Sequence, residues 1–91
     1  MTAASQPNTQ EPLTPKEQEV MEYYSNPFLE KREIASRLFI TVGTLNNHIL
    51  SAFSKLGETD RFAASLKFWW LYPDCRDRVA GEIDKAFNEA A

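Results

Sequence analysis

The chain has 91 residues, of which 43 % are hydrophobic, and its ten basic and thirteen acidic residues give a net charge of −3. A chain of this length builds one small domain, and its two Trp and six Phe exclude general disorder. Its apolar runs are too short to cross a bilayer and its N-terminus lacks the pattern of a secretory signal, so we expect a soluble, cytoplasmic protein.

The acidic balance argues against a protein that binds nucleic acid by charge alone, because such proteins are normally basic. Residues 1–64 contain six basic and eight acidic residues, and residues 65–91 contain four and five, so neither part is basic. A lone Cys75 cannot form an internal disulfide or a metal cluster. The sequence shows no paired carboxylates, no nucleophile with a base and no glycine-rich phosphate loop, so we expect no enzyme, no cofactor and no metal.

The first helix is marked by its start signal. Residues 1–12 are polar, without apolar periodicity, and we expect a disordered arm there. Thr14 is then suited to cap a helix, Pro15 takes the first helical position, and Glu17 completes a capping box. Leu13 is placed to pack just outside the cap. The apolar stripe of the helix consists of Val20, Met21 and Tyr24. The helix is expected to end at Ser25, Asn26 and Pro27.

Two further helices are predicted, one from Leu29 to Leu38 and one between Thr41 as N-cap and Gly57 as C-terminal stop. The second of them is amphipathic. Its buried stripe consists of Leu45, Ile49, Ala52, Phe53 and Leu56. Its outward face carries Thr44, Asn46, Asn47, His48, Ser51, Ser54 and Lys55. Two helices joined by so short a turn are typical of a helix-turn-helix, whose second helix enters the major groove of DNA; the alternative is a surface helix with a solvated polar face.

Asp60 is suited to cap a fourth helix, which we expect to end near Tyr72 and Pro73. This helix holds Phe62, Ala63, Leu66, Trp69 and Trp70. A last helix is predicted from Asp74, with a narrow apolar stripe of Val79, Ile83 and Phe87. This stripe needs a covering surface, either Trp69 and Trp70 of the same chain or a second subunit, and we favour the same chain because a small domain gains most by enlarging its own core.

Three ordered blocks of the sequence resemble the DNA-binding domain of the LuxR/FixJ family of bacterial transcription regulators, over about residues 13–66. The first block, residues 13–21, reads Leu-Thr-Pro-Lys-Glu-Gln-Glu-Val-Met, which resembles the family's Leu-Thr-x-Arg-Glu-x-Glu-Val-Leu. Residues 32–41 read Arg-Glu-Ile-Ala-Ser-Arg-Leu-Phe-Ile-Thr, similar to Lys-Glu-Ile-Ala-x-x-Leu-x-Ile-Ser. Residues 43–49 and 53–57 read Gly-Thr-Leu-Asn-Asn-His-Ile and Phe-Ser-Lys-Leu-Gly, similar to Gly-Thr-Val-Lys-x-His-Val and a closing Lys-Leu-Gly.

The resemblance implies an all-α fold of four helices, with the third helix in the major groove and dimerisation through the fourth. The expected division is an arm over residues 1–12, a helix-turn-helix domain over 13–70 and an additional helical extension over 71–91. Only twelve residues precede Leu13, so we expect a stand-alone regulator without the family's sensory domain.

Several positions depart from the family pattern. Asn46 stands where the family usually has Lys, which removes a phosphate contact but leaves a side chain able to pair with adenine. Leu50 falls on the outward stripe, where the family often carries a polar or basic side chain. Phe28 replaces a usual Gly, and Phe62-Ala63 replaces a common Thr-Gln pair.

The sequence therefore predicts a small transcription regulator that binds duplex DNA as a homodimer. The expected DNA-binding residues are Thr44, Asn46, Asn47, His48, Ser51, Lys55, Lys31 and Arg32. The expected dimerisation residues are Phe62, Leu66, Trp69 and Trp70. The alternative is a protein-interaction module on the same fold, which uses Leu50 and the acidic surface to dock on another regulator or an RNA polymerase subunit.

Overall fold

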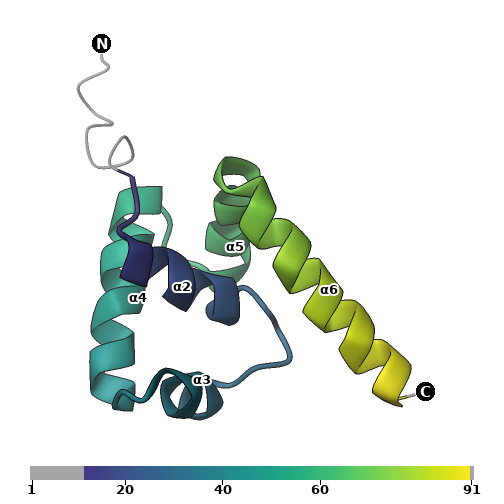
Figure 1. Ribbon diagram of the computed structural model, residues 1–91. Coiled ribbons are helices and arrows are strands. Elements are labelled where there is room, and N and C mark those ends of the chain that lie inside the picture. The colour runs from purple at the N-terminus through teal and green to yellow at the C-terminus, as the bar shows by residue number, and fades with distance from the viewer. Residues whose placement is uncertain (1–11, 91) are drawn as a thin grey trace.

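The structure is a computed structural model that describes residues 12–90, and these residues form five helices and no strand (Figure 1). The helices are α2 (Pro15–Tyr24), α3 (Lys31–Leu38), α4 (Val42–Leu56), α5 (Arg61–Leu71) and α6 (Pro73–Ala90). The prediction of an all-α fold is confirmed. Apart from Pro12, the predicted N-terminal arm lies outside the described residues.

The predicted helix caps are present. The Thr14 hydroxyl accepts a hydrogen bond from the Glu17 amide at 3.1 Å, and the Glu17 carboxylate accepts one from the Thr14 amide at 2.9 Å. This reciprocal pair is the capping box that the sequence predicts for α2. At the start of α4, the Thr41 hydroxyl accepts from the Thr44 amide at 3.0 Å, and Gly57 closes the helix in the left-handed conformation with φ of 73°.

Two predicted boundaries are wrong by one or two residues. The second helix begins at Lys31 and not at Leu29, because Leu29 belongs to the preceding turn, in which its amide donates to the Asn26 carbonyl at 3.2 Å. The Asn26 side chain also accepts from the Phe28 amide at 3.0 Å, a local bond that favours a turn over a helix. The last helix begins at Pro73 and not at Asp74, since proline is well suited to a first helical position.

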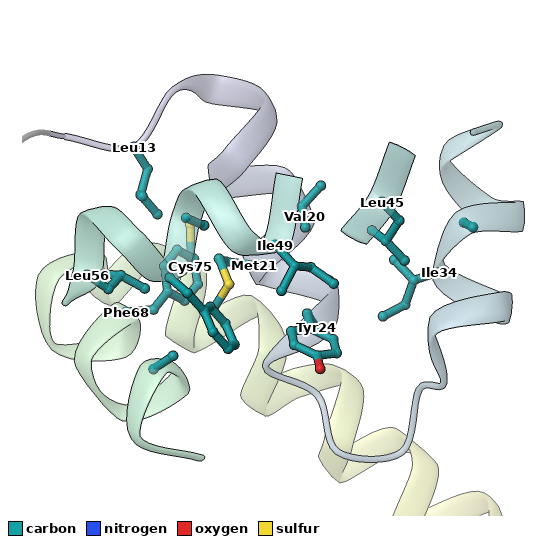
Figure 2. Close-up of a cluster of buried hydrophobic side chains, with 14 residues drawn as sticks. Leu13, Val20, Met21, Tyr24, Ile34, Leu45, Ile49, Leu56, Phe68 and Cys75 are labelled. Carbon is teal, nitrogen blue, oxygen red and sulfur yellow. The ribbon is translucent and has the colours of Figure 1, made fainter. Parts of the chain in front are cut away.

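The core lies where α2, α4 and α5 meet, and α3 closes it at the N-terminal end of α4 (Figures 1 and 2). Figure 2 shows Met21, Ile49, Leu56 and Phe68 converging from three helices. Phe68 is among the largest fully buried side chains, although it is not among the residues named for the predicted fourth helix. The largest fully buried side chains are Val20, Met21, Ile34, Leu45, Leu56 and Phe68.

α6 packs on α2 and α5 through its N-terminal half, where Cys75 and Val79 are buried. Arg78 also reaches back to α2 and donates to both carboxylate oxygens of Glu22 at 2.9 Å. The C-terminal half runs away from the other helices (Figure 1), and Phe87 remains 61 % exposed. Val79 is therefore packed within the chain, as predicted, but Trp70, one of the two predicted covering residues, is 83 % exposed, and the end of the stripe is only weakly covered. None of the helices in residues 12–90 is long and apolar enough to cross a membrane.

Candidate nucleic-acid interface

The turn between α3 and α4 has the three residues that a helix-turn-helix requires, Phe39 to Thr41. Its first residue, Phe39, adopts the left-handed conformation with φ of 59° and ψ of 42°, and its side chain is 94 % exposed. The amides of Phe39 and Ile40 donate to the carbonyls of Ser36 and Ala35 and so close α3. The left-handed backbone conformation costs a bulky residue about 1 to 2 kcal/mol of free energy. The turn therefore combines a strained backbone with an exposed aromatic side chain.

The N-terminal half of α4 presents polar side chains to solvent. Thr44 and Asn47 are exposed, and the Thr44 hydroxyl is 3.0 Å from the hydroxyl of the Thr41 cap. The first turn of a helix also directs its free amides outward, and their partial positive charge attracts phosphate oxygens. This end of α4 therefore combines free hydrogen-bonding groups with an electrostatic preference for an anion.

Further along α4, Ser51 and Lys55 are held by Glu17 of α2. The Ser51 hydroxyl donates to one carboxylate oxygen at 2.5 Å, and the Lys55 ammonium donates to the other at 2.9 Å. Glu17 is only 6 % exposed. Its burial tends to raise the pKa of Glu17, but the bonds from Ser51, the Thr14 amide and Lys55 outweigh burial and lower the pKa from 4.5 to about 2. Both predicted DNA-binding residues thus have a partner within the chain.

Asn46 and His48 lie at the borders of the outward face, and both are half-buried. The side-chain oxygen of Asn46 is enclosed and finds no hydrogen-bond partner among the described residues. Leu50 follows Asn46 by one helical turn and is 66 % exposed, as the sequence analysis expects for an outward position.

The charge of the molecule is unevenly distributed along the chain. Residues 30–57, which contain α3 and α4, carry four basic and two acidic residues, whereas the rest of the chain has a net charge of −5. Lys31 and Arg32 are exposed at the start of α3, and no carboxylate in residues 12–90 forms an ion pair with either. Lys31 lies over the Tyr24 ring, with its ammonium 5.9 Å from the ring centre. The net charges of residues 1–64 and 65–91 do not reveal that α3 and α4 together are basic.

Arg61 has a structural role that no local pattern of the sequence indicates. Its guanidinium stacks on the Tyr24 ring at 4.1 Å and donates to the carbonyl oxygens of Tyr24, Asn26 and Leu29, at 2.8 to 3.0 Å. Arg61 belongs to α5, whereas the three carbonyls belong to the end of α2 and the loop that leads to α3. The side chain therefore fixes this loop and, with it, the position of Lys31 and Arg32 at the start of α3.

The outer face of α5 is apolar. Phe62, Leu66 and Trp70 follow one another at four-residue steps, and all three are exposed, Trp70 by 83 %. Trp69 is half-buried, and its indole nitrogen donates to the Ser25 hydroxyl at 3.0 Å. Of the four predicted dimerisation residues, three therefore lie together on an open face, and Trp69 lies at its border.

The family described as bacterial regulatory proteins, luxR family, matches residues 11–67, well over half of the chain. The chain belongs to the LuxR family. A comparison with curated proteins and with solved structures finds no significant match.

The match places α2, α3, α4 and the first part of α5 inside the LuxR-family domain, and α6 outside it. The resemblance seen in the sequence is thereby confirmed. This is a family of DNA-binding transcription regulators and not of enzymes. Outside the match, burial and the neighbouring Glu22 raise the pKa of the Cys75 thiol.

Proposed function

We propose that this LuxR-family protein regulates transcription in the cytoplasm by binding duplex DNA as a homodimer, with α4 of each subunit in a major groove. The observation that carries the proposal is the open N-terminal half of α4 on a helix pair that is net positive, with Lys31 and Arg32 exposed at the start of α3 and without an ion-pair partner among residues 12–90. The acidic remainder of the chain would point away from the DNA. This arrangement would allow a protein with a net charge of −3 to bind a polyanion.

The proposed contacts follow from the exposure of each side chain. Thr44 and Asn47 would reach base edges, because they are exposed on the N-terminal half of the helix. Asn46 and His48 are half-buried in the protein, so they would contact DNA only at the borders of the groove.

Phosphates would be held by Lys31 and Arg32, which have no competing carboxylate among the described residues. Ser51 and Lys55 are shared with Glu17, so phosphate has to compete with a carboxylate for the Lys55 ammonium. Lys55 should therefore contribute less to the salt dependence of binding than an unpaired lysine does.

Dimerisation is proposed through the exposed face of α5, formed by Phe62, Leu66 and Trp70, with Trp69 at its border. Exposed aromatic side chains in one row are typical of an interface, and a twofold axis would bring the same row of two subunits together. Two copies of α4 would then be available to two half-sites of DNA.

A pair of matched substitutions tests the DNA proposal. Arg32→Glu and Lys85→Glu change the net charge of the chain by the same amount, but Arg32 lies at the start of α3 and Lys85 on the projecting part of α6. We expect fluorescence anisotropy with labelled duplexes to show at least tenfold weaker binding for Arg32→Glu and a much smaller change for Lys85→Glu. Equal effects of the two substitutions would mean that binding follows only net charge and would refute the proposed interface.

A second candidate function is a protein-interaction module, and the exposed apolar side chains next to the groove-binding face favour it. Three apolar side chains on or beside α4 are exposed, namely Phe39, Val42 and Leu50. They are unfavourable in water and would contribute little to DNA binding, whereas a protein partner could bury them. In this case α4 would dock on another regulator or a polymerase subunit. Absence of duplex binding at low salt, together with loss of a captured protein in Leu50→Lys, would favour this function over DNA binding.

A further inference from the structure

The second half of α6 is only partly covered within the described residues. Cys75 and Val79 are the buried residues of this helix, and from Ala80 to Glu89 no side chain is fully buried. A helical segment without a packed face is marginal in water, because propensity alone seldom stabilises a short helix. Phe28 gives one contact, edge to face with Phe87 at 5.3 Å, but both rings remain more than half exposed.

The open side of α6 is a groove rather than a flat surface. Its walls are Trp69 of α5 and one face of α6, formed by Arg76, Ala80, Ile83, Asp84 and Phe87. The lining is mostly apolar. Its two charged residues, Arg76 and Asp84, lie one helical turn before and one helical turn after Ala80. A small residue at the centre allows another helix to approach closely.

The order of the charged residues along α6 indicates which partner could fill the groove. Arg76, Ala80 and Asp84 follow one another at four-residue steps, so they form one line along the helix. A second copy of α6 laid antiparallel across Ala80 would bring Arg76 opposite Asp84 of the partner subunit, and Asp84 opposite the partner's Arg76. Twofold symmetry therefore matches both charges at once, which a parallel pairing does not do.

The ends of the helix also match under this symmetry. Phe87 lies seven residues after Ala80, which is about 10 Å along the helix axis, and Pro73 lies seven residues before it. Phe87 would therefore meet the N-terminal end of the second α6, beside Trp70 and Leu71. Both of these side chains are at least half exposed, and Trp70 is the most exposed tryptophan of the chain.

We propose that α6 is a self-association helix, which pairs antiparallel with α6 of a second copy about an axis at Ala80. The inference goes beyond the dimer contact proposed for α5, because it assigns a partner to the helix that lies outside the LuxR-family match. An axis at Ala80 would hold the two Trp70 side chains at opposite ends of the α6 pair, so the α6 pairing is a contact separate from the one proposed for the exposed row on α5.

Charge reversal in the full chain tests this pairing. Arg76→Asp places two carboxylates in each proposed contact, and Asp84→Arg places two cations there. Each variant alone should dimerise at least tenfold more weakly than the wild type in sedimentation equilibrium. An equimolar mixture of the two variants should recover wild-type affinity, because each contact of the heterodimer again joins opposite charges. Lys85→Asp, a reversal outside the groove lining, serves as the control and should leave self-association unchanged.

The two substituted positions are exposed, so both variants are expected to fold, and circular dichroism verifies this. Failure of the mixture to recover affinity, or a strictly monomeric wild-type chain at hundreds of micromolar, overturns the α6 pairing. A dimer that resists both reversals but dissociates in Leu66→Asp would show association through α5 alone. Duplex binding, measured in parallel, reports separately on the DNA proposal, since a monomer with an intact α4 would still bind DNA weakly.

Discussion

The carboxylate of Glu17 should contribute a large share of the stability of this domain, and Glu17→Gln measures it. The pKa of Glu17 is lowered from 4.5 to about 2, although burial by itself acts in the opposite direction. A lowering of this size corresponds to about 3 kcal/mol of unfolding free energy at neutral pH. A domain of this length has a total stability of roughly 4 to 12 kcal/mol, so the loss would be easily measured.

The pH dependence gives the sign of the effect. Because the folded-state pKa lies below the unfolded value, the contribution of Glu17 is fully present above about pH 5 and disappears as the pH falls towards 2. Urea unfolding followed by circular dichroism should therefore show a gap of about 3 kcal/mol between wild type and Glu17→Gln at pH 7, and almost none near pH 2. Other titrating groups are common to both proteins and cancel in the difference.

Glu19→Gln is the matched control, since Glu19 lies on the same helix and pairs with Lys16 at 3.0 Å but is exposed. Its substitution should change the stability by less than about 1 kcal/mol. A stabilising role of the Glu17 carboxylate is refuted if Glu17→Gln is as stable as Glu19→Gln at pH 7, or if its difference in stability from the wild type is the same at pH 7 and pH 2. A surviving Glu17→Gln variant should also release Lys55 and steepen the salt dependence of DNA binding.

Three further substitutions address single side chains. Asn46→Lys should steepen the salt dependence of duplex binding by roughly 0.9 per subunit in a log-log plot, and a loss of affinity confined to the preferred site would show instead that Asn46 reads a base. Leu50→Lys should strengthen duplex binding at moderate salt, measured by anisotropy, because a charge replaces an exposed leucine near the phosphates; weaker binding would contradict the proposed orientation of α4. Phe39→Gly should stabilise the domain by about 1 kcal/mol in urea unfolding, whereas Phe39→Ala should not, because only glycine relieves the left-handed conformation.

The helical architecture could be predicted because its signals are local. Thr14, Glu17, Thr41 and Gly57 act within one turn of their own helices, and all four form the predicted caps. The amphipathic stripe of α4 likewise depends only on spacing, and its five predicted residues are buried. The error at the start of the second helix comes from the turn around Asn26, whose side chain accepts from the Phe28 amide. The error at the last helix was avoidable, since proline favours a first helical position.

The contacts that control the candidate interface could not be predicted in the same way, because they join residues far apart in the chain. Ser51 and Lys55 meet Glu17 from positions more than thirty residues away, and no local pattern indicates that a capping carboxylate also binds α4. The role of Arg61 could not be predicted for the same reason, because its hydrogen bond to the Tyr24 carbonyl also joins residues far apart in the chain. For Phe68 a signal did exist, since Ala64, Phe68 and Tyr72 recur at four-residue steps, but the neighbouring aromatics obscured it.

A titration of the isotope-labelled chain with a short duplex, followed in amide correlation spectra, tests whether α4 binds DNA. At low salt we expect the largest shift changes on residues 41–51 and on Lys31 and Arg32, with smaller changes on α6, which would face away from the DNA. The expected changes should weaken as salt is added. Spectra that do not respond to duplex at low salt, or changes concentrated on α5 and α6, would contradict a DNA-binding role for α4.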